Sequence, residues 1–468
     1  MDRFYSAAKR LVISSFCFKC ALVGLVLFCL VTFAMELMMT EDLFQMESIG
    51  RNIDDPFQLI YDKSAQHLST SQLRIYVYDV PTAFTTDLLE SAKLSNNTFD
   101  WPAWRQMHAM EVVIHQAMVN LPEASDHQAR AASAVRTLDP EDAALFFVPF
   151  YASLAPSWDL TLYSGLVAHL RQFGRYWDRY GGADHILVAA SKNTLRSAYK
   201  TRAKHLMVQN PIFLTPEMMN YNPDWLKRNF FKLQKNVIIP YFSTIPWEPT
   251  AQSAPGPGLG RKYLASFHGS VDTAVDAQVR RSLAKAMAAR EDCHVSAVTA
   301  KHRAEVSVEE IVEAMAASTF CPCPTGDSRA SKRLADSVHL GCIPVITDPL
   351  LLLPFEGRID WRRAAVFVDL SSRGGRRHHA RTVYDKLLQI LSSMNHNQTQ
   401  LKQQYLKTIS PMLQYNTTVS PNAIKMILDA LDSRYRLLQE KIRAAEYYSH
   451  QYNTWDHLYY RVFNIITG

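Results

Sequence analysis

The sequence predicts an α/β protein built from two domains with parallel sheets. Short apolar runs that suit buried strands alternate with helical patterns between residues 72 and 375. A segment rich in proline, glycine and small polar residues, 248–260, interrupts this alternation. The length of 468 residues is typical of two domains, and a composition of 48% hydrophobic and 20% charged residues supports a real core.

The N-terminal segment is predicted to be a membrane anchor. Residues 11–35 form an apolar run with one charge, Lys19, and at about 1.5 Å per residue this run would cross a hydrocarbon core of about 30 Å. Basic residues precede it and acidic residues follow it, which places residues 1–10 in the cytoplasm and the remainder in the lumen. A cleaved signal peptide is the alternative, but the run is long for one and no clear cleavage site ends it. Residues 36–71 lack a sustained period and are predicted to be a stem.

Glycosylation signals and cysteines agree with a lumenal position. Sequons begin at Asn96, Asn397 and Asn416. An oxidising lumen would allow one or two disulfides among the four cysteines that follow the anchor, with a buried thiol as the alternative for Cys342. The Cys-Pro-Cys spacing at 321–323, without a second cysteine or histidine pair, disfavours a zinc site.

The first domain is predicted over residues 72–247. A short helical turn is expected at Asp139-Pro140, and a helix with one apolar face at 104–120. The predicted strands are 73–79, 144–148, 185–189 and 237–240. Residues 248–260 then form the linker.

The second domain is predicted over residues 261–375. Its expected strands are 263–267, 319–323 and 342–346, and its expected helices are 274–289 and 308–317. Residues 376–468 are predicted to be mainly helices that complete the catalytic unit. There, Ser420-Pro421 suits an N-cap and first helical residue ahead of a long apolar stripe that is expected to pack across both domains.

Residues 317–361 carry the most information, because they read as strand, polar loop, helix and strand. Ligands of open parallel sheets bind at the carboxyl ends of strands, beside helix N-termini. Gly326, Asp327, Ser328 and Arg333 fall at that place, with Ser328 as the expected cap of the helix. Free backbone N–H groups and a cation would suit a diphosphate.

Several motifs in a fixed order resemble the exostosin family of glycosyltransferases, in the single-module form found in plants and algae. The resemblance covers residues 72 to 375. Its motifs are RIYVYDVP at 74–81, DPEDAALFFVPFY at 139–151, Phe267-His268-Gly269 with Arg280, Gly326-Asp327-Ser328 with Arg333, Asp336-Ser337, GCIPVI at 341–346 and Leu353-Pro354-Phe355.

The resemblance implies two Rossmann-like domains that face a cleft (GT-B-like). The first domain would lie on the acceptor side and the second would bind the nucleotide sugar. The implied protein is a type II Golgi membrane enzyme, a hexosyl- or pentosyltransferase. It would move sugar from a UDP-sugar to a glycan or polysaccharide with inversion, and its only small-molecule requirement would be the donor. The resemblance also implies a homo-oligomer or a hetero-oligomer with other glycosyltransferases. It implies no binding of nucleic acid.

The same resemblance assigns donor-binding roles. Arg333 and Arg280 would meet the diphosphate, and Asp336 would bind the ribose. Gly269 and Gly326 would let the backbone approach a phosphate. The competing interpretations are a surface ion pair between Arg333 and Asp336, which are three residues apart, and a simple turn or cap role for Asp327.

Two candidates stand for the general base. Asp79 is expected at the end of the first strand, where a partly desolvated carboxylate would take the acceptor proton. An Asx-turn before Pro81 is its structural alternative. His268 is the second candidate, although a lone histidine is more often structural.

The sequence contains no Asp-x-Asp motif, so fixed cations are expected to stabilise the leaving group and no catalytic metal is expected. The basic cluster at 373–381 suits a solvated loop or, less readily, a site for an acidic glycan. Two further functions stay open. One is a non-catalytic subunit of a Golgi glycosyltransferase complex, and the other is a secreted lectin-like binder.

Overall fold

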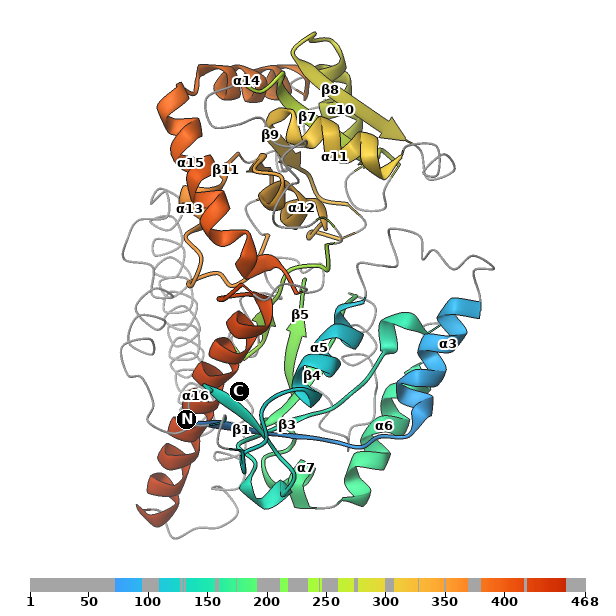
Figure 1. Ribbon diagram of the computed structural model, residues 1–468, viewed down its shortest axis with the longest axis vertical. Helices are drawn as coiled ribbons and strands as arrows, with labels where there is room; N and C mark the ends of the chain where they lie inside the picture. Colours follow the sequence, from blue (N-terminus) through green and yellow to red (C-terminus); the bar gives the residue numbers. More distant parts are fainter. Residues whose placement is uncertain are drawn as a thin grey trace, which may run out of the picture. The chain divides into compact units, whose positions relative to one another are not determined.

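The computed structural model describes most of the chain from residue 72 onward (Figure 1). The described residues are 72–94, 109–126, 129, 132–155, 160–173, 175–191, 211–217, 235–243, 245, 260–272, 277–298, 307–326, 328–348, 351–368, 380–415 and 419–451. The predicted anchor, the stem and nearly all of the linker lie outside them. None of the helices in this part of the chain combines the length and the apolarity needed to cross a bilayer.

The first sheet has six parallel strands in the order β2-β1-β3-β4-β5-β6. They are β1 Leu73–Val77, β2 Ala134–Thr137, β3 Leu145–Phe147, β4 His185–Val188, β5 Ile212–Thr215 and β6 Val237–Ile238. The predicted strands at these places are confirmed, with shorter bounds. Strands β2 and β5 were not predicted, although they are as long as β4.

The second sheet has five parallel strands in the order β11-β10-β9-β7-β8. They are β7 Tyr263–Ser270, β8 Cys293–Val298, β9 Ser318–Cys323, β10 Ile343–Ile346 and β11 Val366–Phe367. Three of these were predicted, whereas β8 and β11 were not. In both sheets the strand order reverses beside the first strand, between β1 and β3 and between β7 and β9, which is where open α/β sheets bind ligands.

Helices connect the strands and complete the chain. They are α3 Thr86–Leu94, α5 Met110–Val119, α6 Leu160–Gln172, α7 Arg175–Arg179, α10 Ala277–Ala288, α11 Val308–Ala316, α12 Arg333–His339, α13 Trp361–Ala364, α14 Ala380–Ser393, α15 His396–Ile409 and α16 Ala423–Gln451, with short 3-10 turns η1 Thr82–Phe84, η3 Pro140–Asp142, η4 Ala152–Leu154 and η6 Pro411–Leu413. The predicted turn at Asp139 is confirmed, since its carboxylate accepts the Glu141 N–H. The predicted cap at Ser420 is wrong, because α16 begins at Ala423 and Asn422 accepts the Lys425 N–H.

One core joins the two sheets. A single cluster of buried side chains includes Ile75 of β1, Phe267 of β7 and Leu431 of α16. Polar contacts also link α16 to both halves, because Arg358 of the second half donates to the Asp429 carbonyl at 2.7 Å and Arg434 donates to the carbonyl of Asn236, just before β6, at 3.3 Å. The stripe on α16 therefore packs against both halves, as the sequence predicted.

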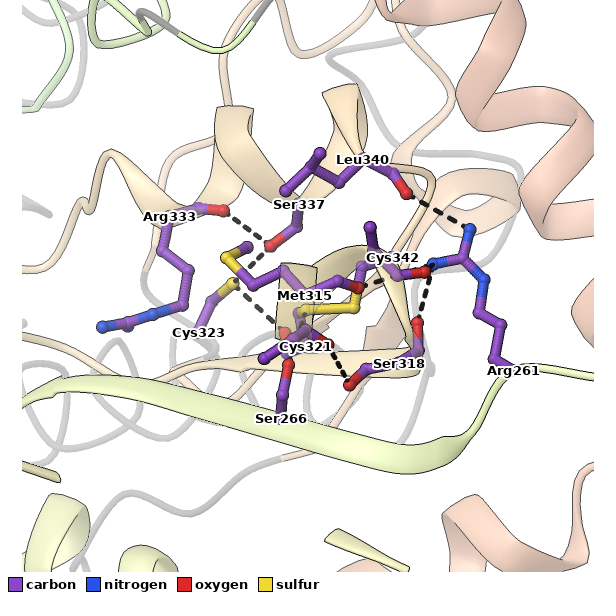
Figure 2. Close-up of a disulfide and its surroundings, with 12 residues drawn as sticks. Arg261, Ser266, Met315, Ser318, Cys321, Cys323, Arg333, Ser337, Leu340 and Cys342 are labelled. Atoms are coloured by element: carbon purple, nitrogen blue, oxygen red, sulfur yellow. Dashed lines mark hydrogen bonds between the residues drawn. A yellow bond between two sulfur atoms is a disulfide. The ribbon is translucent and has the colours of Figure 1, made fainter. Parts of the chain in front are cut away.

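A half-buried arginine and a disulfide connect the elements of the second sheet where β9 begins (Figure 2). Arg261 donates to the carbonyls of Ala316 at 2.7 Å, Ser318 at 2.9 Å and Leu340 at 3.2 Å, which lie at the ends of α11 and α12 and the start of β9. Burial lowers the pKa of its guanidinium to about 10. Cys321 of β9 and Cys342, just before β10, form a disulfide.

Candidate functional site

The carboxyl ends of β7 and β9 bring together most of the predicted donor-binding residues. Gly269 is the second-to-last residue of strand β7, and Gly326 follows β9. Arg280 of α10 and Arg333 of α12 reach these two segments with their guanidinium groups. The cluster therefore lies at the point where the strand order of the second sheet reverses.

Arg280 is a buried arginine that holds backbone. Its guanidinium donates to the carbonyls of Thr325 at 2.6 Å, Ser270 at 2.8 Å and Pro324 at 3.1 Å. Only 5% of the residue is exposed. These bonds tie the end of β7 to the loop after β9, so Arg280 shapes the site through backbone and its side chain is largely occupied.

Of the two arginines in this cluster, Arg333 is the one with a described hydrogen-bond donor that has no partner. Its Nη2 donates to the His268 carbonyl, and its guanidinium carbon lies 5.0 Å from the centre of the Phe267 ring. Its Nη1 is buried and has no hydrogen-bond partner among the described residues. Burial lowers the pKa of the guanidinium, with the nearby Cys323 and Asp336 opposing that shift. A buried cationic donor without an acceptor is costly, and an anionic ligand would satisfy it.

The two glycines make room for the arginines. A Cβ on Gly269 would stand 2.5 Å from Nη2 of Arg333, and one on Gly326 would stand 2.7 Å from Nη2 of Arg280. Gly269 also has φ of +144°, which side chains disfavour. Direct approach of backbone to a phosphate was the predicted reason for these glycines. The contacts give a different one, since the adjacent space holds guanidinium groups.

Asp336 is bonded to neighbours other than Arg333. Lys332 donates to both carboxylate oxygens at 2.9 Å, and the Ser243 hydroxyl, beyond β6 of the first sheet, donates to Oδ1 at 2.6 Å. The competing surface ion pair between Arg333 and Asp336 is therefore wrong. Arg333 is also half-buried, because its guanidinium packs on Phe267.

The loop before α12 differs from the predicted helix start. Helix α12 begins at Arg333, so Ser328 does not cap it. The Ser328 hydroxyl instead donates to the Ala330 carbonyl at 3.2 Å, and its own carbonyl accepts the Gly326 N–H at 2.8 Å. Asp327 lies outside the described residues.

The two candidate bases have opposite surroundings. Asp79 is exposed and lies two residues beyond the end of β1, on the first sheet. His268 is 4% exposed, and neither ring nitrogen has a hydrogen-bond partner in the described chain. Burial, followed by Arg333 and His294, lowers the pKa of His268 to about 3. A base of that strength is poorly matched to neutral pH, so His268 is disfavoured and Asp79 is the remaining candidate.

The four cysteines in the described part of the chain form one disulfide and two free thiols. Besides the Cys321–Cys342 bond, Cys293 and Cys323 are free. Cys323 is buried near Arg333, with its sulfur 3.9 Å from the Ser337 hydroxyl (Figure 2), and burial raises its pKa to about 11. Within the described ranges, no three histidine, cysteine or acidic side chains gather as metal ligands would.

One sequon lies in the described chain. Asn397 is exposed in the first turn of α15, and the Thr399 hydroxyl donates to the His396 carbonyl at 2.8 Å. Asn96, Asn416 and nearly all of the basic cluster at 373–381 lie outside the described residues, so their predicted roles stay predictions.

Sequence reasoning missed Lys332 and Ser243, which hold Asp336, and the Phe267 ring, on which Arg333 packs. It also missed Glu111, a carboxylate that is 1% exposed in the first turn of α5. A signal for Glu111 was present, since it is an acidic residue beside the predicted apolar face of that helix.

Comparison with known proteins gives one family and several relatives. Residues 69–374 match the family described as Exostosin GT47 domain. A probable arabinosyltransferase of Arabidopsis thaliana is 27% identical over 354 residues, which are 69% of this chain and 73% of that protein. A probable glucuronoxylan glucuronosyltransferase of the same plant is 27% identical over 63% of this chain and 61% of its own length. Among solved structures, the GtfA/B complex aligns over 70% of this chain and 60% of its own, with a TM-score of 0.32 and 11% identity, which is too low to support an argument.

Proposed function

Because the chain belongs to the exostosin GT47 family, we propose that it is a glycosyltransferase that moves a sugar from a UDP-sugar to a polysaccharide acceptor with inversion. The names of its relatives support this reaction class, since they include probable arabinosyl- and glucuronosyltransferases. They differ in the sugar that they transfer, so the proposal covers both hexoses and pentoses.

The observation that carries the proposal is the buried, unpartnered Nη1 of Arg333 where the order of the second sheet reverses. In sugar transfer, the acceptor oxygen attacks the anomeric carbon while the bond from that carbon to the diphosphate oxygen breaks. The leaving diphosphate gains negative charge, and a fixed guanidinium in a desolvated site stabilises that charge. Arg333 has a free donor for this purpose, whereas Arg280 spends its own donors on the loops beside it.

The acceptor proton must pass to a base as the new bond forms. We assign this role to Asp79, which follows β1 beside the reversal point of the first sheet. Its carboxylate is exposed, so the hydroxyl of a bound acceptor can reach it.

The enzyme is favoured over a non-catalytic subunit by the same cluster. A buried cation without a partner costs stability, and a subunit that only assembled partners would gain nothing from keeping it.

We also propose a type II position in the Golgi membrane, with the described part of the chain in the lumen. The Cys321–Cys342 disulfide supports an oxidising compartment. Protein that leaves microsomes on carbonate extraction, without glycan, would contradict the anchored lumenal position.

A donor and acceptor panel tests the reaction. The full-length chain is incubated with UDP-arabinose, UDP-glucuronic acid or UDP-galactose and with xylan or xyloglucan oligosaccharides, and release of UDP and product mass are measured. Sugar transfer from one of these donors is the expected result. If no donor is turned over, alone or with a relative co-expressed, the enzyme proposal fails.

A further inference from the structure

Glu111 is a buried carboxylate that the proposed chemistry does not use. It lies in the first turn of α5 and is 1% exposed. Among the described residues, no lysine or arginine lies within ion-pair distance of it. A buried acid without a cation is costly to ionise. The hydrogen bonds that Glu111 accepts therefore indicate why a carboxyl group lies at this position.

Its bonds run to two loops of the first sheet. The backbone N–H of Ser153 donates to both carboxylate oxygens, at 3.3 Å and 3.1 Å, and the N–H of Ala190 donates to Oε1 at 3.2 Å. Ser153 belongs to η4, which follows β3, and Ala190 follows β4. Glu111 therefore joins α5 to the loops at the carboxyl ends of two neighbouring strands.

These loops lie where a ligand of the first sheet is expected. The strand order of that sheet reverses between β1 and β3, and Asp79 follows β1. Tyr151, which also follows β3, bonds through its hydroxyl to Nδ1 of His115, one turn after Glu111 on α5, at 2.8 Å. The network thus fixes the wall next to the proposed base.

We propose that Glu111 is a positioning residue for the acceptor, acting through the loops after β3 and β4. The proposal rests on the proposed function for the identity of the ligand, a polysaccharide hydroxyl. Its claim about the loops can be measured separately, because it concerns two backbone amides of the free protein.

The proposal can be tested by varying the pH, because the ionisation of Glu111 changes how firmly it holds the two loops. Burial raises the pKa of Glu111 to about 8, against hydrogen bonds from Ser153 and Ala190 that lower it. The titratable groups recorded around it are Tyr151, whose pKa burial and Glu111 raise to about 12, and His115, whose pKa burial and then Arg136 lower. Hydrogen bonds from the two amides favour the ionised form, but burial outweighs them, so the closed arrangement favours the protonated acid. Ionisation above pH 8 therefore favours conformations in which water reaches the carboxylate, and the loops are held less firmly above pH 8 than below it.

The experiment compares the wild type with Glu111→Gln, which keeps an amide oxygen but cannot ionise. In the wild type, KM for the oligosaccharide acceptor should rise as pH rises from 7 to 9, on the order of tenfold, because small displacements of the loops that bind the acceptor are costly. In Glu111→Gln the KM should stay at its low value across this range, because the neutral amide resembles the protonated acid. Glu310→Gln, an exposed acid in the first turn of α11, is the matched control and should behave as wild type.

Hydrogen exchange of the free protein gives the second readout. After correction for intrinsic rates, protection of the Ser153 and Ala190 amides should fall between pH 7 and 9 in the wild type and stay level in Glu111→Gln. A variant with the same pH response as wild type in either measurement overturns the positioning role. If the wild type transfers no sugar, the proposed function fails, and amide exchange alone then decides whether Glu111 holds the loops.

Discussion

The guanidinium of Arg333 occupies the space that a side chain on Gly269 would need. A Cβ there would stand 2.5 Å from Nη2, closer than such atoms come in real proteins. The glycine and the arginine therefore depend on each other, although 63 residues separate them and no pattern in the sequence pairs them.

Gly269→Ala should impair the site through this contact. The new methyl group displaces Arg333, and φ of +144° adds backbone strain, for a loss of about 1–3 kcal/mol in the free energy of unfolding. Donor turnover should fall by about tenfold or more. Gly260→Ala is the control, because nothing lies within 4 Å of its Cβ position. Equal turnover in the two variants would refute the steric account.

Arg333→Ala should lower turnover by about 10²-fold or more, on the order of the ~2.7–4 kcal/mol lost with one charge-stabilising donor. Arg333→Lys should restore only part of it, since a point charge cannot replace the planar fork. Thermal melts accompany the kinetics, because the guanidinium packs on Phe267 and its loss should cost about 1 kcal/mol of stability. Exposed Arg281→Ala serves as the control. Near-normal turnover of Arg333→Ala would remove Arg333 from the donor site.

Acid should destabilise the fold through His339. Burial lowers the pKa of this residue to about 4, and its Nδ1 bonds to the Ser410 hydroxyl at 2.8 Å. As pH falls below about 6.5, the unfolded chain binds a proton that the folded chain refuses. Stability is therefore lost, by about 2 kcal/mol between pH 7 and 5. Urea unfolding at both pH values should show a smaller difference for His339→Gln than for wild type, and exposed His396→Gln should match wild type. An unchanged pH difference in His339→Gln would exclude this source.

Loss of the disulfide should lower stability without touching the donor site directly. Cys321 and Cys342 are 21 residues apart, and closing a loop of this size contributes about 3 kcal/mol through the unfolded chain. Cys342→Ser should therefore melt at a lower temperature, and reductant should lower the wild-type melting temperature in the same way. Cys293→Ser, which removes a free thiol, should melt like wild type. A melting temperature that ignores reductant would contradict this prediction.

Donor turnover should survive chelation within a few-fold. The sequence has no Asp-x-Asp motif, and Arg333 offers a fixed cation for the diphosphate. The measurement is UDP release with excess chelator, followed by addition of manganese. Activity that disappears and returns only with manganese would show that an ion, in addition to Arg333, balances the leaving group.

The sequence could predict the strands that carry sustained apolar runs, because burial on both faces leaves a local record. The sequence also predicted that Gly326 and Arg333 lie close to the carboxyl end of β9, because both follow that strand within a few residues along the chain. It could not predict that Asp336 would bond to Ser243, 93 residues away, or that Arg280 would bind three carbonyls. Carbonyls are present at every residue, so their partners are decided only by tertiary packing.

The hydrogen bonds of Arg261 can form only in a fixed order while the second half is being synthesised. It opens that half, yet one of its partners, the Leu340 carbonyl, lies 79 residues downstream. A ribosome adding roughly 5–20 residues per second reaches that partner some 4–16 seconds later. Until then one acceptor of the guanidinium is missing, and Arg261 cannot join β9 to α12. The second half therefore cannot complete this set of hydrogen bonds until residue 340 has been synthesised, so α12 joins α11 and the start of β9 only late in translation of the chain.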